Sequence, residues 1–214
     1  MTFDPRRTLQ ARALARKVVI ACEGRKTEPS YFHDIRTHLR ASTIDIVLVP
    51  HQGTDPATLV AAADDKRAEL KRARRWSPGD TAWAVFDGEE HQDTDGKRQR
   101  WHDAVQRAES QDIKLAVSNP SFELWYLLHF QAQNGALNRS QALSALRGHR
   151  PDYEKNRSLF SELHASGLTA VATGLASSLC AQCEEGGWDR WRNPSTRVHL
   201  LVTHLLALRP GRPG

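Results

Sequence analysis

Two short apolar runs, VVIACEG at residues 18–24 and TAWAVFDGEE at residues 81–90, decide how this chain is expected to fold. Each run is apolar at consecutive positions, which is typical of a strand buried on both faces of a parallel sheet. Each also leads into acidic residues, Glu23 in the first run and Asp87 and Glu89 in the second. We therefore predict two buried strands whose carboxyl ends carry the polar chemistry of the protein.

The segments around these runs predict further strands that alternate with helices. Apolar stretches indicate strands at residues 44–49 and 113–117, and helical spacing of apolar residues indicates helices over 27–39, 56–77 and 101–110. Alternating strands and helices indicate βαβ crossovers. We expect an α/β fold, with a mostly parallel four-stranded sheet and flanking helices.

From Pro120 onward the pattern predicts helices alone, over roughly residues 140–147, 157–184 and 195–208 after a first helix near Phe122. A length of 214 residues suits one α/β domain with a C-terminal helical extension. The boundaries that we predict are a basic flexible arm at 1–16, an α/β core at 17–130, a helical extension packed on the core at 131–208 and a tail at 209–214.

The composition favours a soluble globular protein, with 39% apolar and 26% charged residues. No apolar run approaches the ~20 residues that span a bilayer, and residues 1–16 lack the pattern of a secretory signal. We therefore expect a cytoplasmic protein without membrane contact. Cys180 and Cys183 form a lone CxxC, which we interpret as thiols packed in a helix rather than a zinc site.

The basic residues, which give a net charge of +5, are unevenly placed. They crowd residues 6–17 and, more densely, residues 66–75. Two interpretations of the second cluster stay open. Its cations can complement the C-terminal dipole of a helix, or they can contact a phosphate backbone.

The acids after the two central strands predict a cation site. Ligands of parallel α/β sheets bind outside the carboxyl ends of the strands, so Glu23, Asp87 and Glu89 converge if these two strands are neighbours. Converging carboxylates repel one another unless a cation lies between them, and Mg²⁺ prefers such oxygen ligands. The alternatives are a solvated loop acid for Glu23 and a turn cap for Asp87.

Other residues near this edge of the sheet are candidates for phosphate or metal contact. Ser118 and Asn119 precede Pro120 at an expected helix start, where exposed N–H groups can bind phosphate or form a plain cap. Lys26 can stabilise phosphoryl charge or lie solvated on the surface. Glu123 can be a further metal or water ligand or form a salt bridge.

Four ordered segments resemble the motifs of RloB-family proteins. The resemblance covers about residues 17–208 and is carried by VIACEGRKTEPSYF (19–32), VFDGEEH (85–91), SNPSFELWYLLHF (118–130) and NPSTRVH (193–199). No separate mechanism is evident for the last of these segments, which reads as a capped helix start.

The resemblance implies a Toprim-like core, the α/β metal-binding unit of topoisomerases, primases and OLD-type nucleases. A Toprim site uses a glutamate after its first strand and Asp-x-Asp after its third, which Glu23 and Asp87 match. Glu89 replaces the second aspartate, and Glu90 or His91 can share its role. The implied cofactor is Mg²⁺ or Mn²⁺.

The same resemblance implies a nuclease in anti-phage defence that cleaves DNA or RNA, including tRNA. RloB-type genes are associated with restriction loci and abortive infection, commonly beside an ABC-type or AAA-type ATPase, which is the expected partner. A homodimer is a further open expectation. The alternatives are a non-catalytic adaptor that binds nucleic acid or the ATPase, and a nucleotidyl transferase that uses the same Toprim chemistry.

Overall fold

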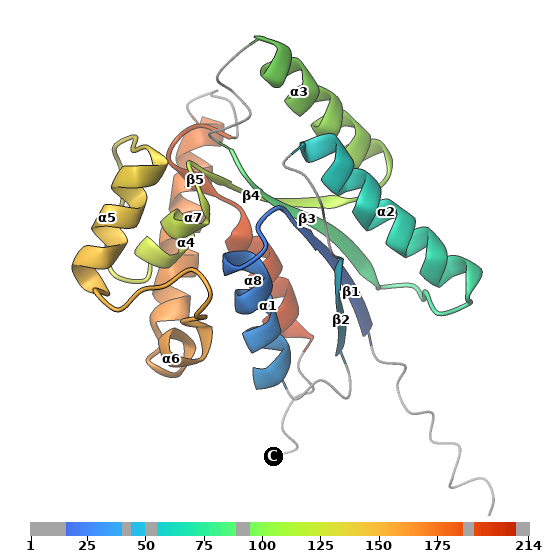
Figure 1. The fold of residues 1–214 in the computed structure, drawn as a ribbon, viewed down its shortest axis with the longest axis horizontal. Helices are drawn as coiled ribbons and strands as arrows, with labels where there is room; N and C mark the ends of the chain where they lie inside the picture. The colour runs from blue at the N-terminus through green and yellow to red at the C-terminus, as the bar shows by residue number, and fades with distance from the viewer. Residues whose placement is uncertain (1–15, 40–43, 50–54, 89–94, 186–190, 209–214) are drawn as a thin grey trace, which may run out of the picture.

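The structure, a computed structural model, describes residues 16–39, 44–49, 55–88, 95–185 and 191–208 (Figure 1). Its strands form one sheet in the order β2-β1-β3-β4-β5. The bounds are β1 Arg16–Cys22, β2 Ile44–Val49, β3 Thr81–Asp87, β4 Lys114–Asn119 and β5 Ser195–Thr196. The first four are parallel, and β5 runs antiparallel to β4. The predicted α/β fold and its four parallel strands are confirmed, and β5 is an addition.

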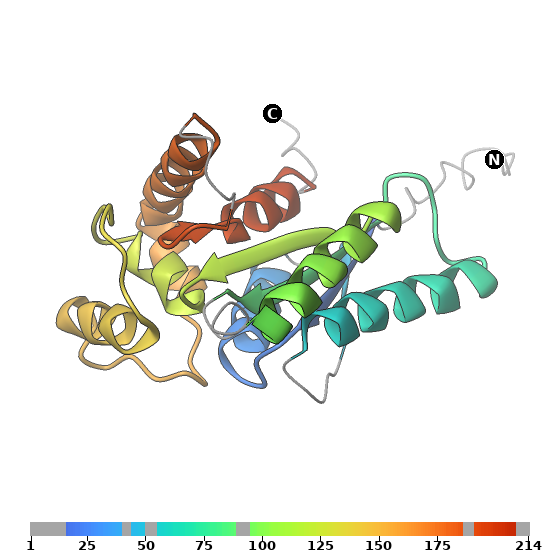
Figure 2. The ribbon, with the colours of Figure 1, turned by 90° about the horizontal axis from the view of Figure 1, so that it is seen from above.

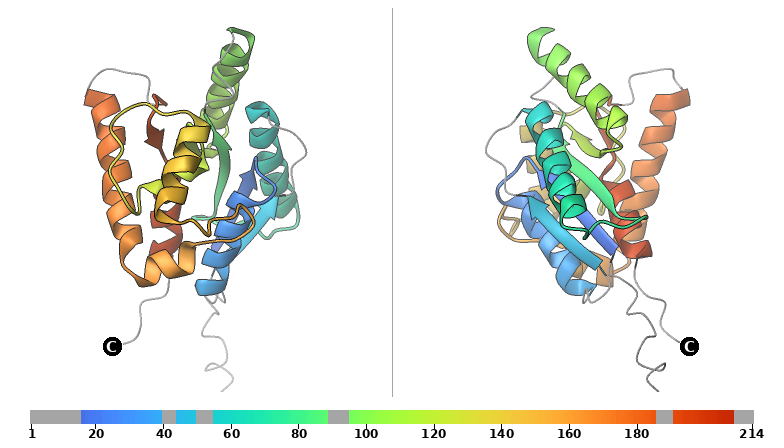
Figure 3. Two further views of the ribbon diagram at one scale, coloured as in Figure 1. Left: turned by 60° about the vertical axis from the view of Figure 1, so that its left-hand side comes forward. Right: turned by 90° about the vertical axis from the view of Figure 1, so that its right-hand side faces the viewer.

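The helices cover both faces of this sheet (Figures 1 and 2). Their bounds are α1 Thr27–His38, α2 Pro56–Arg72, α3 Asp95–Ser110, α4 Phe122–Leu127, α5 Arg139–His149, α6 Phe160–Ala165, α7 Leu168–Glu185 and α8 Val198–Ala207. In Figure 3, α7 and α8 lie on the side of the sheet away from α2. No helix among the described residues is long and apolar enough to cross a bilayer.

The strand order explains which helix covers which face. From β1 the chain moves one way to β2, and then crosses back over β1 to β3 and on to β4. Because βαβ crossovers are right-handed, this reversal puts α1 on one face and α2 and α3 on the other. The side chains of β1 divide accordingly: Val18 and Ile20 pack with α1, whereas Val19 and Ala21 pack with α2 and α3.

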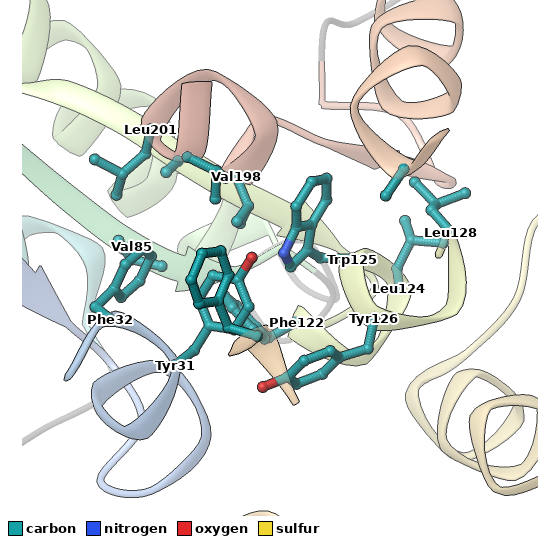
Figure 4. Close-up of a cluster of buried hydrophobic side chains, with 14 of the residues drawn as sticks. Tyr31, Phe32, Val85, Phe122, Leu124, Trp125, Tyr126, Leu128, Val198 and Leu201 are labelled. Carbon is teal, nitrogen blue, oxygen red and sulfur yellow. The ribbon is translucent and has the colours of Figure 1, made fainter. Parts of the chain in front are cut away.

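The core on the α1 side is built around Tyr31, which is fully buried. Its ring meets those of Phe32, Phe122, Tyr126 and Phe160 edge-on, at centroid distances of 5.3–5.5 Å. Figure 4 shows the first three of these rings beside Tyr31. These rings come from α1, α4 and α6, and α7 and α8 add aliphatic residues to the same cluster. The C-terminal helices therefore share one hydrophobic core with the parallel sheet.

The C-terminal half differs from the predicted helices at two places. The helix expected over residues 157–184 is two helices, because Gly167 adopts φ +76 after α6, a conformation that favours glycine and ends a helix. The helix expected over 195–208 begins only at Val198. Ser195 and Thr196 instead pair with the end of β4, where Thr196 and Ser118 share a hydroxyl hydrogen bond of 2.7 Å.

Candidate active site

The polar edge of the sheet is organised where the strand order reverses, between β1 and β3. These strands are hydrogen-bonded neighbours, with Cys22 paired to Val85, so the neighbour relation assumed from the sequence is correct. The backbone N–H of Glu23 donates to the Val85 carbonyl at 2.9 Å. The backbone N–H of Asp87 donates to Glu23 Oε2, also at 2.9 Å. Two acids 64 positions apart thus meet at the point where parallel α/β sheets bind ligands.

The carboxylate of Asp87 connects β3 to the helical half of the protein. Its Oδ1 accepts the backbone N–H of Phe122, at the start of α4, at 2.9 Å. Its Oδ2 accepts a hydrogen bond from Arg139 Nη2, at the start of α5, at 2.7 Å. The Asp87 side chain is 16% exposed, so this ion pair lies partly shielded from solvent.

Two buried glutamates complete the acidic group. Glu28, in the first turn of α1, is 5% exposed, and its Oε1 accepts the backbone N–H of Gly24 at 3.3 Å. Glu123, in α4, is 3% exposed. Its Oε2 accepts the hydroxyl of Ser121 at 2.7 Å, and its Oε1 lies 3.4 Å from both the Tyr153 hydroxyl and Lys155 Nζ.

All four acids line one cleft of about 390 Å³. The same cleft is lined by four cationic side chains, Arg25, Lys26, Arg139 and Lys155. The first two and Lys155 are solvent-exposed, whereas the acids lie deeper. The cleft therefore has an acidic floor and a basic mouth, an arrangement suited to a cation and a phosphate together.

Burial and mutual repulsion raise the pKa values of two of these acids. For Asp87, burial raises the pKa first and the charge of Glu28 raises it further, and the guanidinium of Arg139 offsets these effects only in part. For Glu28, burial again comes first, followed by the charges of Glu23 and Glu123. Each carboxylate thus makes ionisation of its neighbours less favourable, which a bound cation would relieve.

The chemistry of these side chains fits a hard divalent cation. Carboxylate oxygens are the ligands that Mg²⁺ and Mn²⁺ prefer. Within the described ranges, no three acidic, histidine or cysteine side chains already surround a common point where an ion would lie, and Arg139 contacts Asp87 in this conformation. The fit therefore rests on the carboxylate donor set and its repulsion, not on a preformed coordination sphere.

The structure brings together four of the residues singled out from the sequence. Glu23, Lys26, Asp87 and Glu123 all line the cleft. Glu89, Glu90 and His91 lie outside the described residues.

Ser118 and Asn119 do not form the exposed helix terminus that the sequence suggested. Both belong to β4, and α4 begins only at Phe122. They are 1% and 4% exposed, and the Asn119 Nδ2 donates to the Trp191 carbonyl at 2.7 Å. Because strand pairing buries both residues, we do not propose that they bind phosphate.

Four charged residues of the cleft were missed by sequence reasoning, and one of them is Arg25, although it lies two residues after Glu23. Glu28 was interpreted as part of a helix start, although its position five residues after Glu23 could have placed it at the same strand end. Arg139 and Lys155 follow Asp87 by 52 and 68 positions (139 − 87 and 155 − 87) in a helical region without a motif that links them to the sheet. Tertiary packing of α4 and α5 brings them back to the acids.

The basic cluster at residues 66–75 lies elsewhere. Because α2 returns from the carboxyl end of β2 to the beginning of β3, its last turn lies at the opposite edge of the sheet from Glu23. Lys66 pairs with Glu69 at 2.7 Å, and Arg67 donates to Asp64. These local ion pairs, and the position of the cations towards the C-terminal end of α2, favour the interpretation that they complement the helix dipole.

Comparison with known proteins identifies the family of the chain. A family model described as RloB-like protein matches residues 18–205, a range that includes the acids of the cleft, all but the first two residues of β1 and all but the last two residues of α8. No curated protein and no solved structure matches at a significant level. The chain belongs to the RloB-like protein family.

Proposed function

We propose that this RloB-like protein is a divalent-metal-dependent nuclease that hydrolyses phosphodiester bonds of DNA or RNA. The observation that carries the proposal is the single cleft in which four carboxylates lie beneath four cations. The resemblance of its motifs to a Toprim-like site supports the same reading, because Glu23 directly follows the first strand and Asp87 is the last residue of the third.

In this proposal Glu23 and Asp87, with Glu89, hold Mg²⁺ or Mn²⁺. When bound, such an ion polarises a phosphoryl oxygen and lowers the pKa of an attacking water. Glu28 lies in the same cleft, and its raised pKa suits it to accept a proton from that water. The Glu123 carboxylate accepts a hydrogen bond from the Ser121 hydroxyl and lines the cleft on the α4 side.

The cations of the cleft have a complementary role. Lys26 lies at the mouth and can contact the substrate phosphate as it enters. Arg139 and Lys155 already pair with Asp87 and Glu123, so they can transfer their hydrogen bonds to phosphate oxygens when the carboxylates bind an ion. Charges placed in this way stabilise the phosphoryl group as negative charge develops.

The biological setting that we propose follows from the resemblance. It is anti-phage defence, with an ABC-type or AAA-type ATPase as the partner that holds or activates the nuclease. Adding the cognate ATPase to the cleavage assay tests this part, because we expect it to change the rate at which the pure protein cuts.

A non-catalytic adaptor is the second candidate. The contact that favours it is the ion pair between Arg139 and Asp87, which supplies positive charge where the nuclease requires a metal. Titration calorimetry separates the two: the nuclease proposal expects binding of Mn²⁺ or Mg²⁺ at millimolar metal or below, whereas the adaptor expects none.

Cleavage assays test the main proposal. Labelled DNA and tRNA are incubated with the protein and with Mg²⁺, Mn²⁺ or EDTA, with and without the ATPase. We expect metal-dependent cleavage that falls on the order of 100-fold or more in Glu23→Gln and Asp87→Asn, and that persists in Asp65→Asn, a matched change at an exposed position of α2. Undiminished cleavage in the two cleft variants, or no cleavage under any condition, would contradict the proposal.

A further inference from the structure

The closing motif NPSTRVH (residues 193–199) has so far no role in the proposed chemistry. In the structure the chain around it lies along the end of β4, held at both sides. Asn119 Nδ2 donates to the Trp191 carbonyl at 2.7 Å, and the backbone N–H of Arg197 donates to the Val117 carbonyl at 2.8 Å. Together with the bond between Ser118 and Thr196, these contacts fix the motif to the sheet.

From this fixed position, Asn193 reaches across to the connection between α4 and α5. Its Nδ2 donates to the carbonyl of Leu137 at 2.7 Å, and its Oδ1 accepts the backbone N–H of Leu137 at 3.2 Å. One side-chain amide thus satisfies both backbone groups of a single residue. We call these two hydrogen bonds between Asn193 and Leu137 the amide clasp. Leu137 is itself buried in the main hydrophobic core, so the clasp lies in a well-packed region.

Two residues after Leu137 comes Arg139, the first residue of α5. The residue between them, Asn138, caps this helix: its Oδ1 accepts the Gln141 N–H at 2.9 Å, and its own N–H donates to Gln141 Oε1 at 2.8 Å. The backbone from the clasp to Arg139 is therefore fixed on both sides. Arg139 then extends to Asp87 Oδ2 at 2.7 Å.

These contacts form one continuous path from β4 through Asn193 and Leu137 to Arg139 and the cleft. We propose that Asn193 is a positioning residue that, by clasping Leu137, holds the guanidinium of Arg139 where it meets the substrate phosphate. The inference rests on the proposed function, in which Arg139 contacts that phosphate. It also gives Ser118 and Asn119 a part, since they anchor the motif from which Asn193 acts.

The physical reason is the entropy of a long side chain. An arginine on a loosely held connection samples many positions, and binding must then order both the loop and the side chain. A clasp that orders the backbone beforehand lowers this cost at the moment of binding. Asn193 therefore affects phosphate binding through Arg139 and not through a contact of its own.

A double-mutant cycle tests this coupling. The affinity of a fluorescent single-stranded DNA oligonucleotide is measured with Ca²⁺, a cation that carboxylates also bind, and gel electrophoresis checks that the oligonucleotide stays uncut. The proteins compared are the full-length protein, Asn193→Ala, Arg139→Gln and the double variant. We expect each single variant to bind about tenfold more weakly, as for loss of one charge-assisted contact, and the double variant to bind like Arg139→Gln alone. Asn134→Ala, the same change at an exposed position of the α4–α5 connection, should bind like the unmodified protein.

Backbone hydrogen exchange gives a readout that does not depend on nuclease function. Loss of the clasp should speed exchange of the Leu137 amide at least tenfold in Asn193→Ala while the amides of β4 keep their protection. If Asn193→Ala fails to fold, Asn193→Asp replaces it, because it keeps the acceptor for the Leu137 N–H and loses the donor to its carbonyl.

The outcomes separate the two proposals. Unmodified protein that binds neither this oligonucleotide nor tRNA contradicts the nuclease proposal, and with it the phosphate contact on which the role of Asn193 depends, even if the Leu137 exchange still shows the clasp. If the protein binds, three results each overturn the role of Asn193: normal affinity in folded Asn193→Ala, additive losses in the double variant, or unchanged exchange at Leu137.

Discussion

Glu28 is the acid whose neutralisation we expect to stabilise the metal-free protein. Its side chain is 5% exposed, and its pKa is raised by burial and then by the charges of Glu23 and Glu123. Glu28→Gln keeps the shape of the side chain and the oxygen that accepts the Gly24 N–H. It removes the negative charge that its neighbours disfavour.

The size of the effect follows from electrostatics. In general, two like charges about 6 Å apart repel by roughly 2–3 kcal/mol at an effective dielectric of about 20. Exchanging a charged for a neutral hydrogen-bond acceptor gives back about 1 kcal/mol. The net gain is about 2 kcal/mol at pH 7. For a chain of 214 residues this raises the melting temperature by roughly 4–8 °C.

The stabilisation by Glu28→Gln should increase as the pH rises. Because the pKa of Glu28 is higher in the folded than in the unfolded protein, the folded state releases this proton less readily, and ionisation lowers its stability. Below the unfolded pKa, about 4.3 for glutamate, both states are protonated and the penalty disappears. It grows as the pH rises and is complete above the folded pKa.

Thermal unfolding followed by circular dichroism in EDTA, from pH 4 to pH 8, measures both effects. We expect Glu28→Gln to melt above the unmodified protein at pH 7 and close to it at pH 4, whereas Asp65→Asn, on the exposed side of α2, shows no such trend. A Glu28→Gln protein that is less stable at pH 7, or whose gain is the same at every pH, would refute the unfavourable ionisation of Glu28 that burial and the neighbouring acids cause.

Two further predictions concern the metal and the core. Mn²⁺ at about 100 times its dissociation constant should stabilise the protein by about 2.7 kcal/mol, which is measured as a rise in melting temperature. We expect no such rise in Glu23→Gln or Asp87→Asn. Equal rises in all three proteins would exclude the cleft as the binding site. Tyr31→Ala should lower the free energy of unfolding by about 3–5 kcal/mol in urea titrations, because this buried ring meets four others edge-on; a loss below about 1 kcal/mol would contradict its central place in the core.

The sequence predicted the parts of the fold that depend on local pattern. The consecutive apolar residues of β1 and β3 identified buried strands, and the acids at their carboxyl ends identified the edge of the sheet where the acidic cleft lies. The reason is that parallel strands bring all their carboxyl ends to one side of the sheet. The position of Glu23 beside Asp87 needed one further fact, the adjacency of β1 and β3, which the structure supplies.

The parts that escaped prediction are those that tertiary contacts decide. A strand of two residues such as β5 has no periodicity to recognise, and Ser195 and Thr196 become a strand because β4 lies beside them. Arg139 contacts Asp87, and Asn193 contacts Leu137, across 52 and 56 positions of the chain, and no local sequence pattern links the partners. Glu28 was hidden by an equally good local explanation, since acids in the first turn also stabilise helices.

Whether Glu23 and Asp87 share a divalent cation is tested most directly by diffraction from crystals grown with Mn²⁺, with data collected at the manganese absorption edge. We expect an anomalous peak within coordination distance of both carboxylates, at about 2.0–2.3 Å, with the Arg139 side chain moved away from Asp87. A map with the cleft ordered, Mn²⁺ in excess and no peak between these two side chains would contradict the metal site and the nuclease built on it.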